Sequence, residues 1–349
     1  MPPTQKELAK LAGVSSGTVS NVVSGAPGVS ERSRRKVLDA IKTLNYQPNL
    51  IARSLKTNRT FTLGIVIPDI TIPFFPKIIR GAESAAREAG YFLTVLDSES
   101  SHERETAMIT LLRSQRVEGI LLVTSGGHKW SNEESATLTA GVPIVCLDRL
   151  PEGLEVDSVS VDDCRATEMA ITHLMSMGHT RIGIITGPLT LKNEQERLRG
   201  YRQALRKGGI PLRESLIWKG SFEQKDVERL CLDGLLQPAG RPTALFATNG
   251  VTGLAALRSI YAMGLTTPRD IACATFDEPI SEDFFRPGIT SVVQPANDIG
   301  RQAIRVLLKR IGEGPVHQPI EKVRLPATLI VRESSGTPLA ESSRKSRSS

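Results

Sequence analysis

The sequence predicts an α/β protein with a small helical domain at the N-terminus and a two-lobed body of doubly wound parallel sheets. Three observations predict this fold. The first sixty residues are basic and helical, the pattern changes at Thr62 to apolar runs alternating with helical stretches, and these strand-helix units are too numerous for one sheet. The length of 349 residues is ample for two or three domains.

Charge separates the N-terminal domain from the body. Residues 1–60 contain ten lysines and arginines against three acidic residues, so they alone account for the formal net charge of +7. The remaining residues balance to zero. A basic domain on a neutral body indicates a polyanionic partner for the first sixty residues only.

Three helices are expected in the N-terminal domain. Thr4 and Glu7 have the spacing of a capping box, which starts the first helix. Ser15 can cap a second helix after a turn at Gly13, and Ser30 can cap a third over residues 31–44. The apolar positions expected to form their common core are Leu8, Leu11, Ala12, Val19, Val22, Val23, Val37, Leu38, Ile41 and Leu44. Two helices joined by a short turn that contains glycine form a helix-turn-helix, whose second helix enters the major groove of DNA.

Three short motifs are more specific than this pattern. They are AGVSSGTVS from Ala12 to Ser20, NYQPN from Asn45 to Asn49 and ARSL from Ala52 to Leu55. These motifs resemble the lactose-repressor/galactose-repressor (LacI/GalR) family of bacterial transcription regulators, and the resemblance covers nearly the whole chain. It implies that bases are read by Ser16, Gly17 and Asn21, and that the residues near phosphates are Ser15, Thr18 and Ser20. The alternative is a three-helix bundle that serves protein contacts.

Two positions of the expected recognition helix depart from the family pattern. Gly17 has no side chain where the family usually presents one, and Asn21 replaces a common arginine. Because Asn pairs bidentately with adenine whereas Arg favours guanine, we expect Asn21 to select adenine in each half-site.

A basic run of Arg32, Arg34, Arg35 and Lys36 opens the third helix. Such a run is more often a solvated face, and some of its members can also touch phosphate. Neutralising a phosphate contact makes the salt dependence of DNA binding shallower without changing the preferred bases.

The segment from residue 48 to residue 60 is expected to be a hinge helix and linker. Asn49 is a good N-cap, and Ile51 and Leu55 share one face. A helix this short needs a neighbour, either a second copy of itself or a groove of DNA. The resemblance makes Leu55 a wedge in the minor groove, and the DNA contacts expected here are Asn49, Ala52, Arg53, Leu55 and Lys56. An amphipathic helix packed on the body is the alternative.

The body is expected to contain two strand-helix lobes. Strands are predicted at residues 62–67, 92–96, 119–123, 144–147, 182–186, 244–247 and 272–276, and helices at 75–89, 103–114, 131–140, 163–177, 194–207, 227–236 and 252–263. Residues 291–312 are expected to supply another strand and helix that return to the first lobe. The resemblance implies a fold like the periplasmic sugar-binding proteins, with three crossovers between the lobes. The domains expected are 1–47 (helix-turn-helix), 48–60 (hinge) and 61–333 (effector-binding and dimerisation), with lobe 1 at 61–161 plus 291–320 and lobe 2 at 162–290 plus 321–333. Residues 334–349 are expected to form a disordered tail.

A ligand site is predicted beyond the carboxyl ends of the body's strands. The polar residues that follow strands are Asp69, Asp97, Asp148, Asn249 and Asp277. The resemblance places effector contacts at Phe74, Phe75, Asp148, Arg197, Phe222, Asn249 and Asp277. Carboxylates, an amide and aromatic rings suit a sugar or sugar derivative. Aspartates that only cap helices, and phenylalanines that only fill the core, are the alternative readings.

The nature of the effector depends on charge. A phosphorylated or carboxylated sugar would need more positive charge than the cations available nearby supply, which are only Arg149, Lys192 and Arg197. This favours a neutral sugar over a sugar acid. Gly250 stands where many relatives carry an acid after the Asn, so the family pattern does not identify the effector.

Enzymatic chemistry is not expected. Gly13 to Gly17 matches G-x-S-x-G, but a helix precedes it where a nucleophile elbow needs a strand. The five histidines have no metal-binding spacing, and neither a cofactor nor a metal is expected. Four scattered cysteines and no secretory leader favour a cytoplasmic protein.

The predicted function is a ligand-responsive transcriptional regulator, a repressor, that acts as a homodimer on a pseudo-palindromic operator. A dimer rather than a tetramer is expected because residues 336–349 contain no apolar heptads. A small-molecule transport receptor without DNA binding is the alternative, and a general architectural DNA protein would not need the two-lobed body.

Overall fold

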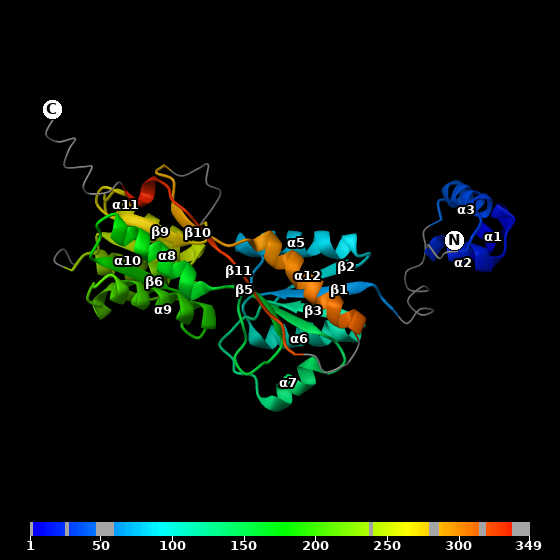
Figure 1. The fold of residues 1–349 in the computed structure, drawn as a ribbon, viewed down its shortest axis with the longest axis horizontal. Helices are drawn as coiled ribbons and strands as arrows, with labels where there is room; N and C mark the ends of the chain where they lie inside the picture. Colours follow the sequence, from blue (N-terminus) through cyan, green and yellow to red (C-terminus); the bar gives the residue numbers. More distant parts are fainter. Residues whose placement is uncertain are drawn as a thin grey trace. The chain divides into compact units, whose positions relative to one another are not determined.

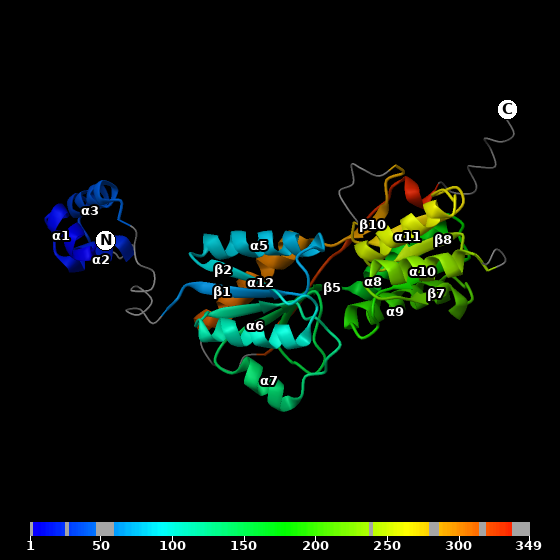
Figure 2. The same cartoon turned by 180° about the vertical axis from the view of Figure 1, so that it is seen from behind.

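The computed structural model describes residues 3–24, 28–46, 59–236, 240–278, 286–313 and 319–336, in two compact units. The first unit is Met1–Phe61 and the second is Thr62–Ser349 (Figures 1 and 2). The predicted hinge helix at residues 48–56 lies outside the described residues. Within the described part of the chain, none of the helices combines the length and apolarity that crossing a membrane requires.

The first unit is the predicted helix-turn-helix. Its helices are α1 (Gln5–Ala12), α2 (Ser16–Ser24) and α3 (Glu31–Leu44). Thr4 and Glu7 form the capping box at the start of α1, and Gly13 ends that helix with φ of 63°. The hydroxyl of Ser15 accepts a hydrogen bond from the Thr18 amide at 3.1 Å and caps α2.

The core of this unit differs from the expectation at two positions. Leu8, Val19 and Val37 are wholly buried as predicted, but Leu11 and Leu38 are 51% and 47% exposed. Ala9 in α1 and Ala40 in α3 are buried instead and complete the hydrophobic core of this unit. Because each helix buries a narrow stripe, a leucine one position off that stripe faces solvent.

The first lobe of the body contains a parallel six-stranded sheet of order β11-β5-β4-β3-β1-β2. Its strands are β1 (Thr62–Ile67), β2 (Phe92–Asp97), β3 (Gly119–Leu122), β4 (Ile144–Leu147), β5 (Asp157–Val161) and β11 (Lys322–Leu325). One face is covered by α5 (Phe74–Glu88) and α12 (Ala296–Glu313), and the other by α6 (His102–Ser114) and α7 (Asn132–Thr139) (Figure 1).

The second lobe repeats this plan with the order β12-β10-β9-β8-β6-β7. Its strands are β6 (Ile182–Thr186), β7 (Ile217–Lys219), β8 (Ala244–Ala247), β9 (Ala272–Phe276), β10 (Thr290–Val293) and β12 (Thr328–Ile330). One face carries α8 (Asp163–Ser176) and α9 (Lys192–Lys207), and the other carries α10 (Gln224–Leu235) and α11 (Gly250–Ala262) (Figure 2). Only β12 runs antiparallel to its neighbour among the described strands of this sheet.

The predicted doubly wound architecture is confirmed, and each predicted body helix begins and ends within three residues of the observed one. The sequence reading missed β5, β7, β11 and β12. In β5 polar residues alternate with valines although the whole strand is buried, and the other three strands have only three or four residues. Such short or mixed runs lack the continuous apolar signal of a buried strand.

The lobe assignment of the C-terminal part needs correction. Strand β10 belongs to the second sheet, where it pairs with β9, although residues 291–320 were expected in the first lobe. Strand β11 pairs with β5 in the first sheet, although residues 321–333 were expected in the second lobe. The chain therefore crosses between the lobes after β5, after β10 and after β11, because pairing partners rather than sequence position decide where each strand lies.

The start of the predicted disordered tail is also corrected. Ser334 and Ser335 are wholly buried. The Thr290 amide donates to Ser334 Oγ at 2.8 Å, and Ser334 Oγ donates to the Cys273 carbonyl at 2.7 Å. These bonds tie the chain to the second sheet up to this point, and residues 337–349 lie outside the described residues.

Helices α5 and α12 approach each other unusually closely. A Cβ at Gly81 would lie 2.0 Å from the Asn297 carbonyl oxygen, and one at Gly300 would lie 2.1 Å from the Ile78 oxygen. Side chains at these positions would force the helices apart. This contact holds α5 in place. The first two residues of α5, Phe74 and Phe75, line a cavity of the body.

Candidate functional site

The outer face of α2 carries the residues expected to read bases. Ser16, Gly17 and Asn21 are all exposed, whereas Val19 and Val22 on the opposite face are buried. The hydroxyls of Ser15 and Thr18 lie 3.0 Å apart at the start of the helix, and Ser20 is half-buried. This face is small, polar and uncharged, which allows close approach to the edges of base pairs.

The remaining residues of the predicted DNA contact set cannot be placed in the same way. Asn49, Ala52, Arg53, Leu55 and Lys56 lie outside the described residues, so their contacts stay predictions. The basic run on α3 lies within the described residues. Arg34 Nε lies 3.8 Å from Glu31 Oε1, and the side chains of Arg32, Arg35 and Lys36 are exposed, so the helix has a positively charged surface.

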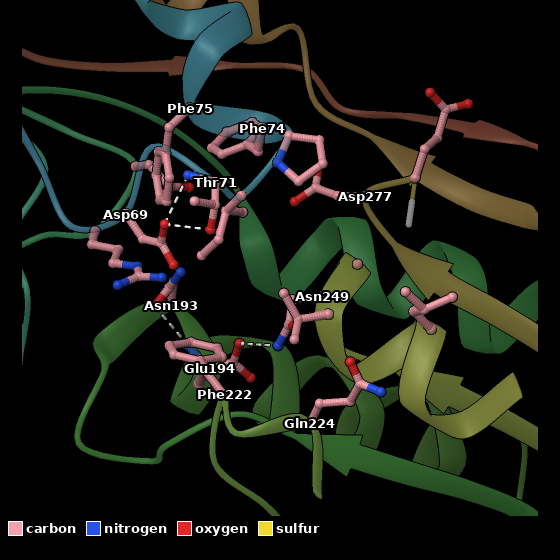
Figure 3. A pocket seen from close by; sticks show the side chains of 18 of the residues that line it. Asp69, Thr71, Phe74, Phe75, Asn193, Glu194, Phe222, Gln224, Asn249 and Asp277 are labelled. Carbon is pink, nitrogen blue, oxygen red and sulfur yellow. Dashed lines mark hydrogen bonds between the residues drawn. The ribbon is translucent and has the colours of Figure 1, made fainter. Parts of the chain in front are cut away.

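A cavity of about 560 Å³ lies between the two lobes of the body. Its lining includes all seven residues predicted to contact an effector: Phe74, Phe75, Asp148, Arg197, Phe222, Asn249 and Asp277. Figure 3 shows Phe74 and Phe75 on one side, opposite Phe222, Glu194 and Asn249 on the other. The structure thus brings these seven residues together although the first and the last, Phe74 and Asp277, are 203 positions apart in the chain.

Two aspartates occupy equivalent positions in the two lobes. Asp148 follows β4 and Asp277 follows β9, with φ of 55° and 60°. The amide of Asp148 donates to the Val159 carbonyl at 3.1 Å, and that of Asp277 donates to the Val292 carbonyl at 2.8 Å. Each left-handed turn directs a carboxylate into the cavity at the carboxyl end of its sheet.

Arg197 is the central cation of the cavity. Its Nε donates to Asp163 Oδ1 at 2.8 Å and its Nη1 donates to the Thr248 carbonyl at 2.7 Å, while its guanidinium lies 3.7 Å from the centre of the Phe276 ring. Burial tends to lower the pKa of Arg197, but the carboxylates around it, Asp163 first, outweigh burial and raise it. Arg197 is therefore a fixed positive charge whose orientation is set before any ligand binds.

Glu194 and Asn249 form a buried network beside this arginine. Glu194 is 1% exposed and accepts hydrogen bonds from the Gly187 amide at 2.9 Å, the Thr248 hydroxyl at 2.5 Å and the Asn249 amide group at 3.2 Å. Asn249 also caps α11 by accepting from the Thr252 amide at 2.9 Å. Asn249 thus has the helix-capping role that the alternative reading assigned to the strand-end aspartates, and its effector contact stays a prediction.

Arg149 is a cavity residue that sequence reasoning had named only as a nearby charge. It is 5% exposed, and its guanidinium lies 5.4 Å from the centre of the Phe75 ring and 4.9 Å from that of Phe222. Among the described residues its buried Nη1 has no hydrogen-bond partner. Burial lowers the pKa of Arg149, and Asp148 opposes this shift. A buried donor without an acceptor is costly, so this atom is suited to receive a ligand oxygen.

Several other side chains line the cavity without having been chosen from the sequence. They include Thr71, Asn193, Glu194, Gln224 and Glu278. Asp69, one of the strand-end residues named from the sequence, also lines the cavity. Glu194 precedes Arg197 by three positions on α9, a helical spacing that could have identified it. Lys192 and Asp97 were named as candidates but do not line the cavity. Asp97 instead accepts hydrogen bonds from the Ile70 amide at 2.9 Å and the Glu99 amide at 2.8 Å.

Three carboxyl groups in or beside the cavity have raised pKa values. Burial raises the pKa of Asp277 to about 7, and Arg197 opposes part of the shift. Burial likewise raises the pKa of Asp163 to about 7 and that of Asp148 above its ordinary value. Gln294, on the crossover after β10, donates to both carboxylate oxygens of Asp277 at 3.2 and 3.0 Å. Over the described residues, no cluster of three or more metal-ligand side chains suits a metal ion.

Comparison with known proteins gives matches over both units. The profile described as "Bacterial regulatory proteins, lacI family" matches residues 4–49, and that described as "Periplasmic binding protein-like domain" matches residues 171–335. The ribose operon repressor of Escherichia coli (strain K12) is 35% identical over 334 residues, which cover 95% of this chain and 99% of that protein.

Two solved structures are similar over nearly the whole chain. The complex of the transcriptional regulator CelR with cellobiose has a TM-score of 0.70 and 33% identity, and covers 95% of this chain and 99% of its own. The lac repressor dimer bound to operator and the anti-inducer ONPF has a TM-score of 0.82 and 25% identity, and covers 96% and 99%. The relatives are transcriptional regulators rather than enzymes. With a relative of this identity and coverage, the chain belongs to the lacI family of bacterial regulatory proteins, as a DNA-binding transcriptional regulator with a periplasmic binding protein-like effector domain.

Proposed function

We propose that this protein is a repressor whose affinity for operator DNA is controlled by a neutral sugar bound in the cavity between the lobes. One observation carries the proposal: the seven residues expected to contact an effector line one cavity, in the same chain as a basic helix-turn-helix domain. The DNA-binding part reads sequence, and the cavity supplies the control.

The chemistry of the cavity supports a ligand with several hydroxyl groups. Asp148 and Asp277 can accept hydrogen bonds from hydroxyls, whereas Arg149 and Arg197 can donate to hydroxyl or ring oxygens. The rings of Phe74, Phe75 and Phe222 can cover the apolar faces of a sugar ring.

Charge in the cavity favours a neutral ligand over a sugar acid. The acidic side chains in the lining are Asp69, Asp148, Glu194, Glu223, Asp277 and Glu278, whereas its basic ones are Arg149 and Arg197. Arg197 is already neutralised by Asp163 and Glu194, at 2.8 and 3.6 Å. At a pH above 7, where Asp277 is ionised, a carboxylate or phosphate on the ligand would therefore meet more acidic than basic side chains in this lining.

The DNA partner follows from the first unit. We propose that α2 enters the major groove, with Asn21 and Ser16 at base edges, and that two copies of the chain bind a pseudo-palindromic operator. One unit of this size buries too little surface for tight and selective binding, whereas a pair matches two half-sites. The lac repressor relative was solved as a dimer on its operator, which is consistent with a homodimer here.

A direct experiment tests both parts. Fluorescence anisotropy with DNA from the upstream region of the protein's own gene should show salt-dependent, sequence-specific binding. Addition of a panel of neutral sugars and their acids should change that affinity for at least one neutral sugar. A protein that binds sugars but no DNA from this region at any salt concentration would instead be a small-molecule receptor, the alternative expected from the sequence.

A further inference from the structure

The loop that follows β3 makes an unusual contact between the lobes. Gly126 in this loop has φ of 78°, and a Cβ placed on it would lie 2.0 Å from Cδ2 of Leu191 in the second lobe. Leu191 is only 3% exposed, although it is the N-cap residue of α9. The leucine side chain thus rests on the bare Cα of Gly126, where a residue with a side chain would collide with it.

The first-lobe side of this contact is firmly held. Glu105 on α6 is wholly buried, and its carboxylate accepts hydrogen bonds from the Ser125 amide at 2.5 Å and the Thr124 hydroxyl at 3.2 Å. The Gly126 amide donates in turn to the Thr124 hydroxyl at 3.2 Å. The loop is therefore held in place by the first lobe, because hydrogen bonds to a buried side chain fix its backbone.

The second-lobe side leads directly to the cavity. The Leu191 carbonyl accepts the Gln195 amide at 3.1 Å and so begins α9. Asn193 and Glu194 in the first turn are 6% and 1% exposed and line the cavity, and Arg197 follows one turn later. The position of Leu191 thus determines where these polar groups stand relative to the Phe75 and Asp148 wall of the first lobe.

We propose that Gly126 and Leu191 are positioning residues for effector binding: their contact sets the separation of the lobes at which the α9 residues meet the first-lobe wall. The inference rests on the proposed effector site. The inference goes beyond that site because it assigns the separation of the lobes to two residues that do not themselves line the cavity. A gap or a bulge at this contact would misplace the α9 side chains by a fraction of an ångström or more, enough to weaken a ligand held from both lobes.

The neighbouring Gly127 offers a matched control. It has nearly the same φ, 76°, but a Cβ placed there would have nothing within 4 Å. Gly126→Ala and Gly127→Ala therefore place an alanine at a similar positive φ, and only Gly126→Ala adds the clash with Leu191. In the double variant Gly126→Ala with Leu191→Ala the clash is absent, because the atoms that would collide, Cδ2 and Cγ of Leu191, are removed with the leucine side chain.

Two measurements on the full-length protein test the proposal. Hydrogen exchange of the unliganded protein should show the peptide 188–198 exchanging about tenfold faster in Gly126→Ala than in Gly127→Ala, with partial return toward the control in the double variant. Calorimetric titration with D-ribose and with cellobiose as probes should show about tenfold weaker binding for Gly126→Ala and non-additive effects in the double variant. Operator affinity without sugar should be unchanged in all three.

The outcomes separate the two hypotheses. Equal exchange in the two single glycine variants would overturn the positioning role, whether or not a sugar binds. If exchange differs as expected but the wild-type protein binds neither probe, then D-ribose and cellobiose are excluded as effectors, and the role of the contact in holding α9 stands on the exchange result. Loss of operator affinity and folding in Gly126→Ala, without rescue by Leu191→Ala, would reduce the pair to a structural contact and reject the inference.

Discussion

Arg197 and Asp163 form a buried ion pair in which the arginine Nε lies 2.8 Å from Oδ1 of the aspartate. Their side chains are only 3% and 8% exposed. Asp163 is the first residue of α8, directly after the first crossover between the lobes, whereas Arg197 lines the cavity. The pair therefore connects a crossover of the chain to the proposed effector site.

Replacement of Arg197 by Met should destabilise the body strongly. It would leave Asp163 and Glu194 buried without their cation, and breaking a buried pair in this way typically costs about 3 to 5 kcal/mol. Urea unfolding at pH 8 should show the loss, and the loss should be smaller at pH 5.5, where Asp163 is protonated. The matched control is Arg199→Met, since Arg199 is 56% exposed and its pairing with Glu196 should contribute at most about 1 kcal/mol. Equal losses for the two variants would contradict the central role given to Arg197.

Stability should fall as pH rises through about 7. The folded pKa of Asp277 is raised to about 7 from its ordinary 3.8, so the folded state binds more protons than the unfolded chain between these values. The stability contributed by this proton is present below the ordinary pKa and is lost as pH rises through the folded pKa; the same sign holds for Asp163. Asp277→Asn should flatten the dependence of the urea midpoint on pH between 5 and 8, and an unchanged slope would show that Asp277 does not titrate there.

Sugar affinity should have the opposite dependence on pH. A hydroxyl that donates to Asp277 favours the ionised carboxylate, so binding releases a proton and strengthens as pH rises toward 8, by at most about tenfold per unit. Titration calorimetry in two buffers of different ionisation enthalpy measures that proton directly. In Asp277→Asn the proton release should disappear, and its persistence there would assign it to another group.

Leu55→Ala should weaken operator binding much more than it weakens effector binding. A leucine wedge that opens a base step contributes only in the DNA complex, where the bent duplex offsets an unstacking cost of a few kcal/mol. Anisotropy with operator DNA and calorimetry with sugar, on the same preparation, give the two affinities. Parallel losses in both would argue against a hinge helix at residues 48–56 and in favour of a helix packed on the body.

Asn21→Arg should change which base is preferred at one position of each half-site. Asn pairs bidentately with adenine and Arg with guanine, and each such pair contributes about 1 to 3 kcal/mol of discrimination. In-vitro selection of operators with both proteins would reveal the change. An identical selected sequence for the two proteins would remove Asn21 from the base-reading set.

Effector control itself has an expected size. Coupling of this kind is typically about 1 to 3 kcal/mol, so saturating sugar should change operator affinity by roughly 5 to 150-fold. Linkage requires that operator DNA change sugar affinity by the same factor. Measurement of both cross-effects checks the coupling without knowledge of the direction of control.

The sequence by itself determined the local elements with strong signals. Thr4 with Glu7, and Ser30, begin helices because their side chains satisfy free amides of the first turn, an interaction of neighbours in the chain. Continuous apolar runs such as Ile182–Thr186 predicted central strands, because a strand buried on both faces has no polar side. The residues after these strands pointed to one cavity, since parallel strands end at a common edge.

Tertiary structure alone decided which partners these elements found. Strand β11 joins the first sheet by pairing with β5, 164 residues earlier when counted from Lys322 to Ser158, and β10 joins the second sheet by pairing with β9. The local sequence has no code for either choice. Burial of Arg149 between Phe75 and Phe222, and the seat of Leu191 on Gly126, exist only when both lobes are assembled. Neighbours in the chain specify helices, strands and turns, but burial, proton affinity and close contact are properties of the packed molecule, because they depend on residues distant in sequence.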